Sequence, residues 1–150
     1  IADGGASRFE SSRNGLALVP DDEEGVVGFH DGVRPFVSAE TIDRCFEAAR
    51  EDYAALPVMP VTDTLRFTGG SSAGRNVPRS DYRIVQTPQV FDIALAKQAF
   101  RQPYRDAFTD DASVVESLGC QVRMVEGNRE NIKLTTPFVL QLAGFIIKQQ

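Results

Sequence analysis

Two charged side chains follow a short apolar run, and their types suit a ligand that carries phosphate. The run Val26–Phe29 is typical of a buried strand, and Asp31 and Arg34 come shortly after it. A carboxylate such as Asp31 binds Mg²⁺ through hard oxygens, and the planar fork of Arg34 matches a phosphate. Because ligands bind at the carboxyl ends of strands in open α/β sheets, we expect a site here. The alternative is an ordinary turn in which Asp31 caps the loop and Arg34 faces solvent.

A second strand brings further polar groups to the same region. Residues 57–61 form an apolar segment that contains two prolines, and they predict a strand. This strand delivers Thr64 and its neighbours to the end of the sheet where we expect Asp31. The chain has one histidine, His30, which we expect to pack at the end of its strand rather than to act as a base.

Glycine and serine residues dominate the first part of the chain. Residues 3–8 include two adjacent glycines and predict a flexible turn whose backbone can lie close to a ligand. Residues 11–19 predict a short helix that Ser11 or Ser12 caps. On these residues alone, a plain loop followed by a helix cap is the favoured interpretation.

The rest of the pattern alternates helices with strands. Ser38 is a typical N-cap, and apolar residues recur at helical spacing over 39–53. This alternation predicts one α/β domain over residues 1–150, built on a mostly parallel sheet. We expect further strands over 84–86 and 121–126, and further helices over 91–100, from 109 to a cap at Gly119, and after Thr136.

Residues 65–82 break this pattern and predict a protruding β-hairpin arm. A glycine-rich turn, residues 69–74, is flanked by basic residues that include Arg79. The arm has too little apolar surface to be stable against its own subunit alone. A second copy of the chain is the simplest cover, so we expect a dimer.

The composition excludes several kinds of partner. The chain has 150 residues and a net charge of −5, which argues against non-specific binding to nucleic acid or to an anionic membrane. Local basic residues must therefore hold any phosphate. No apolar run approaches the roughly 18 residues of a membrane span, and no signal peptide is visible. Cys45 and Cys120 follow no disulfide or metal-binding pattern, which is typical of a cytoplasmic protein.

Six sequence blocks, in this order along the chain, resemble one enzyme family. The chain resembles the 2-C-methyl-D-erythritol 4-phosphate cytidylyltransferases, which use CTP in the non-mevalonate isoprenoid pathway. Each block alone is weak, whereas six in family order are specific and cover nearly the whole chain. The blocks are Gly4-Gly5 with Arg8, Ser11 and residues 14–16, then residues 30–36, 60–64, 86–91, 109–113 and 131–135.

The resemblance implies a Rossmann-like nucleotidyltransferase fold and a homodimer joined by exchanged arms. It implies transfer of a cytidylyl group from CTP to methylerythritol phosphate, with release of pyrophosphate. Gly5 and Ser11 would contact the cytidine part of the nucleotide, and Asp31 would lie near Mg²⁺ and the acceptor. The residues that would hold the acceptor phosphate are Arg34, Thr64, Arg79 and Lys133, of which Arg79 and Lys133 would be catalytic. Thr64 and Arg79 lie in or beside the arm and would serve the site of the partner subunit.

The sequence also departs from the family pattern. The family has an earlier glycine-rich loop with an arginine and then a Pro-Lys pair, which cradle the triphosphate, and we expect this loop to be absent from residues 1–150. Ala6 and Val139 stand where relatives often carry acids. Two alternatives stay open. One is another pyrimidine nucleotidyltransferase, such as one that uses ribitol phosphate, and the other is a noncatalytic, dimerising, ligand-binding module.

Overall fold

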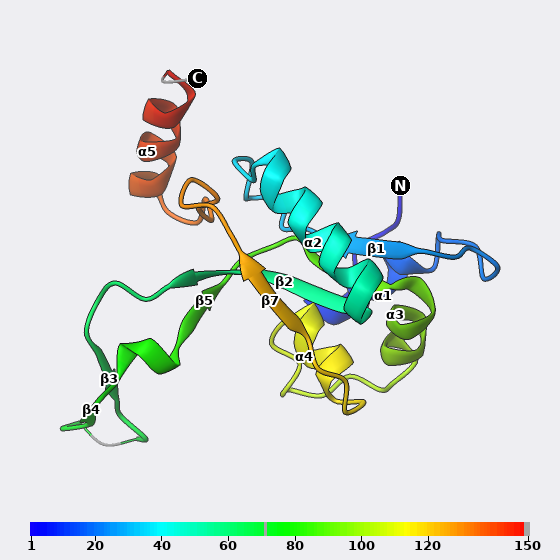
Figure 1. Ribbon diagram of the computed structural model, residues 1–150, viewed down its shortest axis with the longest axis horizontal. Coiled ribbons are helices and arrows are strands. Elements are labelled where there is room, and N and C mark those ends of the chain that lie inside the picture. The colour runs from blue at the N-terminus through cyan, green and yellow to red at the C-terminus, as the bar shows by residue number, and fades with distance from the viewer. Residues whose placement is uncertain (71, 149–150) are drawn as a thin grey trace.

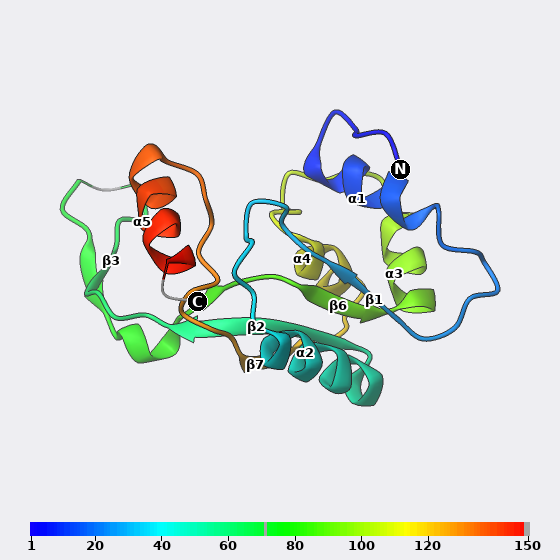
Figure 2. The ribbon, with the colours of Figure 1, turned by 90° about the horizontal axis from the view of Figure 1, so that it is seen from above.

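The computed structural model describes residues 1–70 and 72–148. Helices lie on both faces of a central sheet, and a hairpin and the last helix project from one end of it (Figures 1 and 2). The helices are α1 Arg8–Leu16, α2 Ala39–Asp52, α3 Ile93–Phe100, α4 Asp111–Glu116 and α5 Pro137–Ile147, with the short 3-10 helix η1 Arg79–Asp81. The strands are β1 Val26–Phe29, β2 Ala54–Pro60, β3 Leu65–Phe67, β4 Arg75–Val77, β5 Arg83–Val85, β6 Gln89–Asp92 and β7 Arg123–Glu126.

The central sheet is mixed. Four of its strands follow the order β1-β6-β2-β5, and the fifth strand, β7, also pairs with β2. β2 and β7 pair in parallel, whereas β6 pairs antiparallel with both β1 and β2, and β5 pairs antiparallel with β2. The α/β class is therefore confirmed, but the expectation of a mostly parallel sheet is wrong. β1, β2 and β7 do run in one direction, because β1 and β2 are both antiparallel to β6, which lies between them.

Strand β6 is the element that the sequence pattern missed. Residues from Phe91 onward predicted a helix, yet Gln89, Val90 and Phe91 are buried in the sheet, and α3 begins only at Ile93. Asp92 marks the boundary, since its carboxylate accepts a hydrogen bond from the backbone N–H of Leu95 at 2.9 Å. A strand of four residues that is buried on both faces has no alternation by which a sequence pattern could reveal it.

Two other boundaries also differ from the prediction. Helix α1 begins at Arg8, and Ser7 caps it in a capping box with Glu10, so neither Ser11 nor Ser12 is the cap. Strand β2 begins three residues before residue 57, because Ala54, Ala55 and Leu56 are all buried in the sheet. The N-caps predicted at Ser38 and Thr136 are confirmed.

The core lies in two layers, one on each face of the sheet. Figure 2 shows α2 on one face and α1, α3 and α4 on the other. Ala55 and Val90 face α2, where they pack with Cys45, whereas Leu56 and Phe91 face the other helices. Adjacent residues of one strand thus enter opposite layers, as the pleat requires. On the three-helix side, aromatic rings pack in a row through the pairs Phe9–Phe108, Phe9–Phe100, Phe29–Phe100 and Phe29–Phe91.

The hairpin and α5 expose much of their apolar surface. The predicted hairpin is confirmed, with β3 and β4 paired antiparallel from Leu65 opposite Val77 to Phe67 opposite Arg75. Helix α5 is apolar on all sides, yet Ala143 is its one buried residue among those described. Exposed apolar side chains at this end of the molecule come from the arm and β5 (Phe67, Tyr82, Ile84, Val85) and from α5 (Phe138, Leu140, Leu142, Phe145, Ile147). A surface of this kind is typical of an interaction site.

Neither cysteine forms a disulfide, and none of the described helices has the length and hydrophobicity needed to span a bilayer. Cys45 is buried, and desolvation raises the pKa of its thiol to about 11. The Cys45 side chain therefore packs in the core between α2 and the sheet, and its thiol stays protonated at neutral pH.

The boundary between β6 and α3 can be tested through its cap. We expect Asp92→Ala to lower the free energy of unfolding by about 0.5–2 kcal/mol, because the first turn of α3 loses its side-chain acceptor. Asp92→Asn keeps an acceptor and should cost much less. Urea unfolding measures both, with Asp22→Ala in the exposed loop before β1 as the control. If Asp92→Ala and Asp22→Ala were equally stable, the cap would not define the start of α3.

Candidate active site

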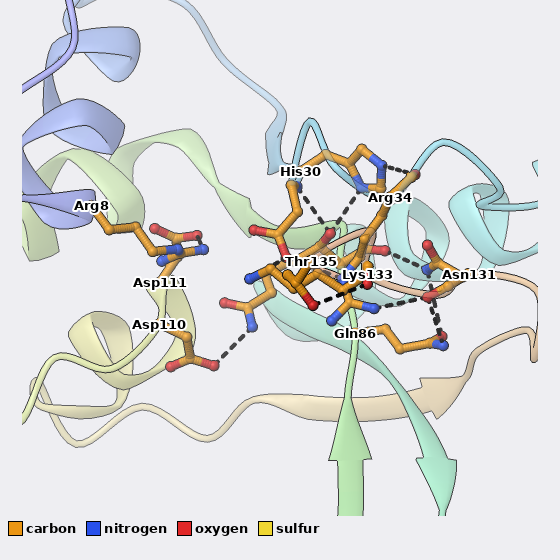
Figure 3. Close-up of polar contacts among 12 residues, drawn as sticks. Arg8, His30, Arg34, Gln86, Asp110, Asp111, Asn131, Lys133 and Thr135 are labelled. Atoms are coloured by element: carbon orange, nitrogen blue, oxygen red, sulfur yellow. Dashed lines mark hydrogen bonds and ion pairs between the residues drawn. The ribbon is translucent and has the colours of Figure 1, made fainter. Parts of the chain in front are cut away.

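The loop after β1 holds a compact cluster of charged side chains. Oδ2 of Asp31 accepts a hydrogen bond from Nε of Arg34 at 3.0 Å and lies 3.2 Å from Nζ of Lys133 (Figure 3). The side chains of Asp31 and Arg34 are 15% and 12% exposed, whereas that of Lys133 is 47% exposed. Desolvation tends to raise the pKa of Asp31, but the hydrogen bonds and charges of Arg34 and Lys133 outweigh it and lower that pKa. Asp31 thus holds two cations beside each other.

His30 and Thr87 fix the conformation of this loop. Nε2 of His30 lies 2.9 Å from the carbonyl oxygen of Arg34, which can only accept, so Nε2 carries the hydrogen. Thr87 Oγ1 accepts from the backbone N–H of Asp31 at 3.0 Å, and its hydroxyl donates to Nδ1 of His30 at 2.9 Å. Both ring nitrogens of His30 are thus engaged in holding the loop.

The segment after β7 delivers Lys133 to Asp31. The backbone N–H of Leu134 donates to the carbonyl of Val33 at 2.8 Å, which joins this segment to the β1 loop. Asn131 is fully buried, and its side chain donates to the carbonyl of Thr87 at 2.8 Å. Its own carbonyl accepts from Nη1 of Arg34 at 2.8 Å and from Gln86 at 3.2 Å. Three separate segments therefore meet at this point.

A second charged cluster joins α1 to the start of α4. The carboxylate of Asp111 is 1% exposed, and its Oδ2 accepts from Nη2 of Arg8 at 2.5 Å (Figure 3). Its Oδ1 accepts from the hydroxyl of Ser12 at 2.8 Å. Desolvation raises the pKa of Asp111, and this effect exceeds the opposing effect of Arg8 and Ser12. The structure thus pairs this acid of α4 with two residues of α1, which are distant in the sequence.

Gln89 of β6 holds the same end of α4 against the sheet. This side chain is 1% exposed, and its amide donates to Oδ2 of Asp110 at 2.8 Å. Its oxygen accepts from the backbone N–H of Ala112, also at 2.8 Å. Because no strand was predicted over residues 89–92, the sequence pattern could not place Gln89 beside α4.

Two cavities open beside these clusters. The larger, of about 480 Å³, lies between α1 and β1 and is lined by residues that include Ser11, Ser12, His30 and Gly32. The smaller, of about 180 Å³, is lined by residues that include Arg34, Gln86, Thr109 and Lys133. Arg8 and Asp31 line both cavities, so the two are adjacent and meet at these side chains. An assembled site thus has a larger compartment near the glycine turn and a smaller, basic one.

The structure brings Gly5 and Ser11 together at the edge of the larger cavity. The backbone N–H of Gly5 donates to Oγ of Ser11 at 2.9 Å, and that hydroxyl donates to the carbonyl of Ser7 at 3.0 Å. A Cβ at Gly5 would lie 2.2 Å from Cβ of Glu10, so no side chain fits there without movement. The glycine is therefore needed for the close approach of the turn to α1.

Thr64 and Arg79 lie away from Asp31 within one chain. Both are exposed, and neither is among the residues that line the two cavities. Arg79 donates instead to the carbonyl oxygen of Thr62 at the base of the arm. Asp31, Arg34 and Lys133 are thus assembled by the fold of one subunit, whereas Thr64 and Arg79 are not joined to them.

Arg8, Asp111, Gln86, Gln89 and Asn131 are site residues to which sequence reasoning gave no role. All five lie within the six sequence blocks that resemble the family, so the blocks could have indicated that these residues belong to the site. Their partners are distant in sequence, as in the pairs Arg8–Asp111 and Gln86–Asn131, and only the fold identifies them.

The fold and the two adjacent cavities define an α/β protein with a candidate ligand site at the carboxyl end of β1. The family model described as "IspD: 2-C-methyl-D-erythritol 4-phosphate cytidylyltransferase" matches residues 1–149. The chain therefore belongs to this family.

Individual relatives agree with this assignment. The chain is 57% identical over 147 residues to the 2-C-methyl-D-erythritol 4-phosphate cytidylyltransferase of Phocaeicola vulgatus and 56% identical over 147 residues to that of Bacteroides fragilis. In each case the match covers 98% of this chain and 66% of the relative, so the chain spans slightly less than two thirds of their length. The crystal structure of the Thermus thermophilus enzyme superposes with a TM-score of 0.86 at 40% identity, over 97% of this chain and 71% of that one.

The ion pairs of Asp31 predict a pH-dependent contribution to stability. Because the folded protein lowers the pKa of Asp31, this contribution is complete above the unfolded value of about 3.9 and is lost as the pH falls through the folded pKa. We expect Asp31→Asn to cost about 1–3 kcal/mol at about pH 7 and much less at about pH 3. Urea unfolding at both pH values measures the difference.

Asp63→Asn is the matched control for this measurement, since Asp63 is an exposed acid in the loop after β2. It should have little effect at either pH. An equal cost of Asp31→Asn at both pH values would contradict a stabilising role for the Asp31 carboxylate.

Proposed function

We propose that the protein transfers a cytidylyl group from CTP to 2-C-methyl-D-erythritol 4-phosphate and releases pyrophosphate. Membership of the family supports the choice of substrates. The observation that carries the proposal in the structure is the cluster of Arg34 and Lys133 on Asp31, in a basic cavity that adjoins a larger one. A reaction between two phosphate-bearing substrates needs such a pair of adjoining compartments.

The reaction needs no nucleophile from the protein. An oxygen of the acceptor phosphate forms a bond to the α-phosphorus of CTP, while the bond from that phosphorus to the oxygen bridging to the β-phosphate breaks. The electron pair of the broken bond leaves with pyrophosphate. Catalysis then consists of holding two polyanions in line and stabilising the charge of the transferred phosphoryl group.

We assign the larger cavity to the nucleotide and the smaller to the acceptor. Ser11 lines the larger cavity and accepts a hydrogen bond from the backbone of Gly5, and these two residues would contact the cytidine part. Lys133, half exposed, and the remaining donors of Arg34 would bind the acceptor phosphate in the smaller one. Asp31 would position both cations, since its carboxylate already contacts them.

We also propose a requirement for Mg²⁺. No group of three or more His, Cys, Asp or Glu side chains suited to a metal gathers among residues 1–70 and 72–148, and Oδ2 of Asp31 is paired with two cations. These residues fit a cation that the triphosphate carries, with Asp31 as its carboxylate neighbour, better than a site built by the protein alone. Bound there, the ion would neutralise phosphate charge and orient the triphosphate.

We further propose that the protein is a cytoplasmic homodimer joined by exchanged arms. The exposed apolar side chains of the arm, β5 and α5 lie at one end of the molecule, where a second copy would cover them (Figures 1 and 2). Thr64 and Arg79 lie outside the cavities of their own chain, which supports a role in the site of the partner. The two free thiols suit a reducing compartment.

The acceptor assignment is tested in the enzyme expressed from its complete reading frame. We expect Arg34→Ala and Lys133→Ala to raise the KM for methylerythritol phosphate roughly tenfold to a hundredfold, as a lost contact of about 1.5–3 kcal/mol implies, with a smaller change for CTP. Steady-state release of pyrophosphate measures this, and chelation of Mg²⁺ should abolish it. Arg50→Ala, on the exposed side of α2, is the control.

Ribitol phosphate is the competing acceptor in the same assay. Efficient turnover with ribitol phosphate and none with methylerythritol phosphate would refute the proposed substrate. Unchanged acceptor kinetics in both variants would refute the roles of Arg34 and Lys133.

The shared site is tested with a mixed dimer. One subunit carries Arg79→Ala and the other carries Lys133→Ala, and each homodimeric variant should have very low activity when the acceptor concentration is well below its raised KM. If Arg79 acts across the interface, one of the two sites carries both changes and the other carries neither, so about half of the activity returns. No recovery, or a monomer in solution, would contradict the proposal.

A further inference from the structure

Arg8 occupies the junction of the two cavities. Its side chain is 42% exposed, and it lines both the larger cavity beside α1 and the smaller, basic one. Among residues 1–70 and 72–148, Asp31 is the one other residue that lines both, and it is an acid already paired with two cations. Arg8 is therefore the cation at this junction in the part of the chain that the structure describes.

The contact with Asp111 leaves Arg8 with donors to spare. Among the described residues, the hydrogen bond of its guanidinium group is the one from Nη2 to Asp111 Oδ2. A guanidinium group has five N–H donors in a planar fork, so other donors stay available for an anion in the cavity. The exposed fraction of the Arg8 side chain agrees with this arrangement. Part of the guanidinium group contacts buried Asp111, and the rest is accessible.

Asp111 and Ser12 make this arrangement rigid. The carboxylate of Asp111 uses one oxygen for Arg8 and the other for Ser12, one turn further along α1. Gln89 in turn holds the backbone of α4 at Ala112 against β6. Arg8 is thus held by a buried carboxylate that is itself fixed to the sheet, which is how a pre-organised electrostatic group is built.

The proposed reaction requires one phosphoryl group at this junction. If CTP occupies the larger cavity and the acceptor phosphate the smaller one, the α-phosphate must lie where the two meet. We propose that Arg8 is a catalytic residue that binds this transferred phosphoryl group, and that Asp111 is the residue that positions Arg8. This inference rests on the proposed cytidylyl transfer and adds an anion-binding group to it.

The test is the kinetics of Arg8→Ala in the enzyme from its complete reading frame. We expect kcat to fall by about 10²–10³, as for the loss of one donor to a developing charge, while the dissociation constant for CTP, measured by calorimetry, changes less than about tenfold. Added guanidinium ion should restore part of the lost kcat, and Arg8→Lys should retain more activity than Arg8→Ala. A residue with a purely structural role would show neither effect.

Two further variants separate chemistry from folding. Arg8→Ala leaves the buried carboxylate of Asp111 unpaired, so Arg8→Ala with Asp111→Asn removes that charge and should restore the thermal midpoint without restoring kcat. Asp111→Asn alone should lower kcat, and the double variant should be no slower than Arg8→Ala, because Asp111 acts through Arg8. Arg13→Ala, also on α1 but beside half-buried Glu10, is the matched control and should leave kcat and its response to guanidinium unchanged.

Three results would overturn the inference. One is a kcat of Arg8→Ala within about threefold of the parent enzyme. Another is a loss of kcat that neither guanidinium nor Arg8→Lys reverses, and the third is recovery of activity together with stability in the double variant. Absence of turnover in the parent enzyme would overturn the proposed function itself, whereas normal parent turnover with an unaffected Arg8→Ala would overturn this inference alone.

Discussion

The carboxylate of Asp31 is the group on which the geometry of the basic cavity depends. Without it, Arg34 and Lys133 would repel each other and could not lie beside one anion-binding space. The carboxylate is itself held by backbone contacts, because His30 and Thr87 fix the loop in which it lies. An acid that appears at first to be a metal ligand therefore has a second role, which is to hold two cations close together before any substrate arrives.

The same principle recurs on the other side of the junction. Asp111 is buried, and it fixes Arg8 much as Asp31 fixes Arg34, so each compartment borders on a cation that a carboxylate holds in place. Both acids depend on β6 or its leading residues, since Thr87 contacts the Asp31 loop and Gln89 holds α4. The antiparallel strand inserted into the sheet is therefore the element that connects the two halves of the site.

The end of the molecule that carries the arm, β5 and α5 differs from the rest in how its apolar residues are covered. Strands β2 and β6 and helices α1 to α4 bury or half-bury most of their apolar residues within one chain, whereas the arm, β5 and α5 leave most of theirs exposed. A helix that is apolar on every side is stable in water only when something covers it. The site and the uncovered surface thus lie on one framework, and assembly with a second copy would join them functionally as well as structurally.

The sequence by itself determined the elements whose signals are local. The apolar run of β1, the caps at Ser38 and Thr136 and the paired strands of the arm depend on neighbouring residues, and all appear as predicted. The predicted turn of the arm includes residue 71, which lies outside the described residues. The six blocks also indicated the family and placed Asp31, Arg34 and Lys133 among the site residues. The predictions of these elements and of the family succeeded because short-range patterns, and the identity of motif residues, do not require knowledge of the fold. The roles of Asp31, Arg34 and Lys133 stay predictions.

Only the tertiary structure decided the rest. β6 looks like the start of a helix because its strand character comes from two neighbouring strands, and the direction of the sheet follows from its insertion. Asp111 looks like an ordinary helix-terminal acid until the fold brings Arg8, which is 103 positions away in the sequence, against it. Pairing between distant segments sets burial, charge and the shape of the cavities, and it arises only when the chain packs, so no local pattern could have contained it.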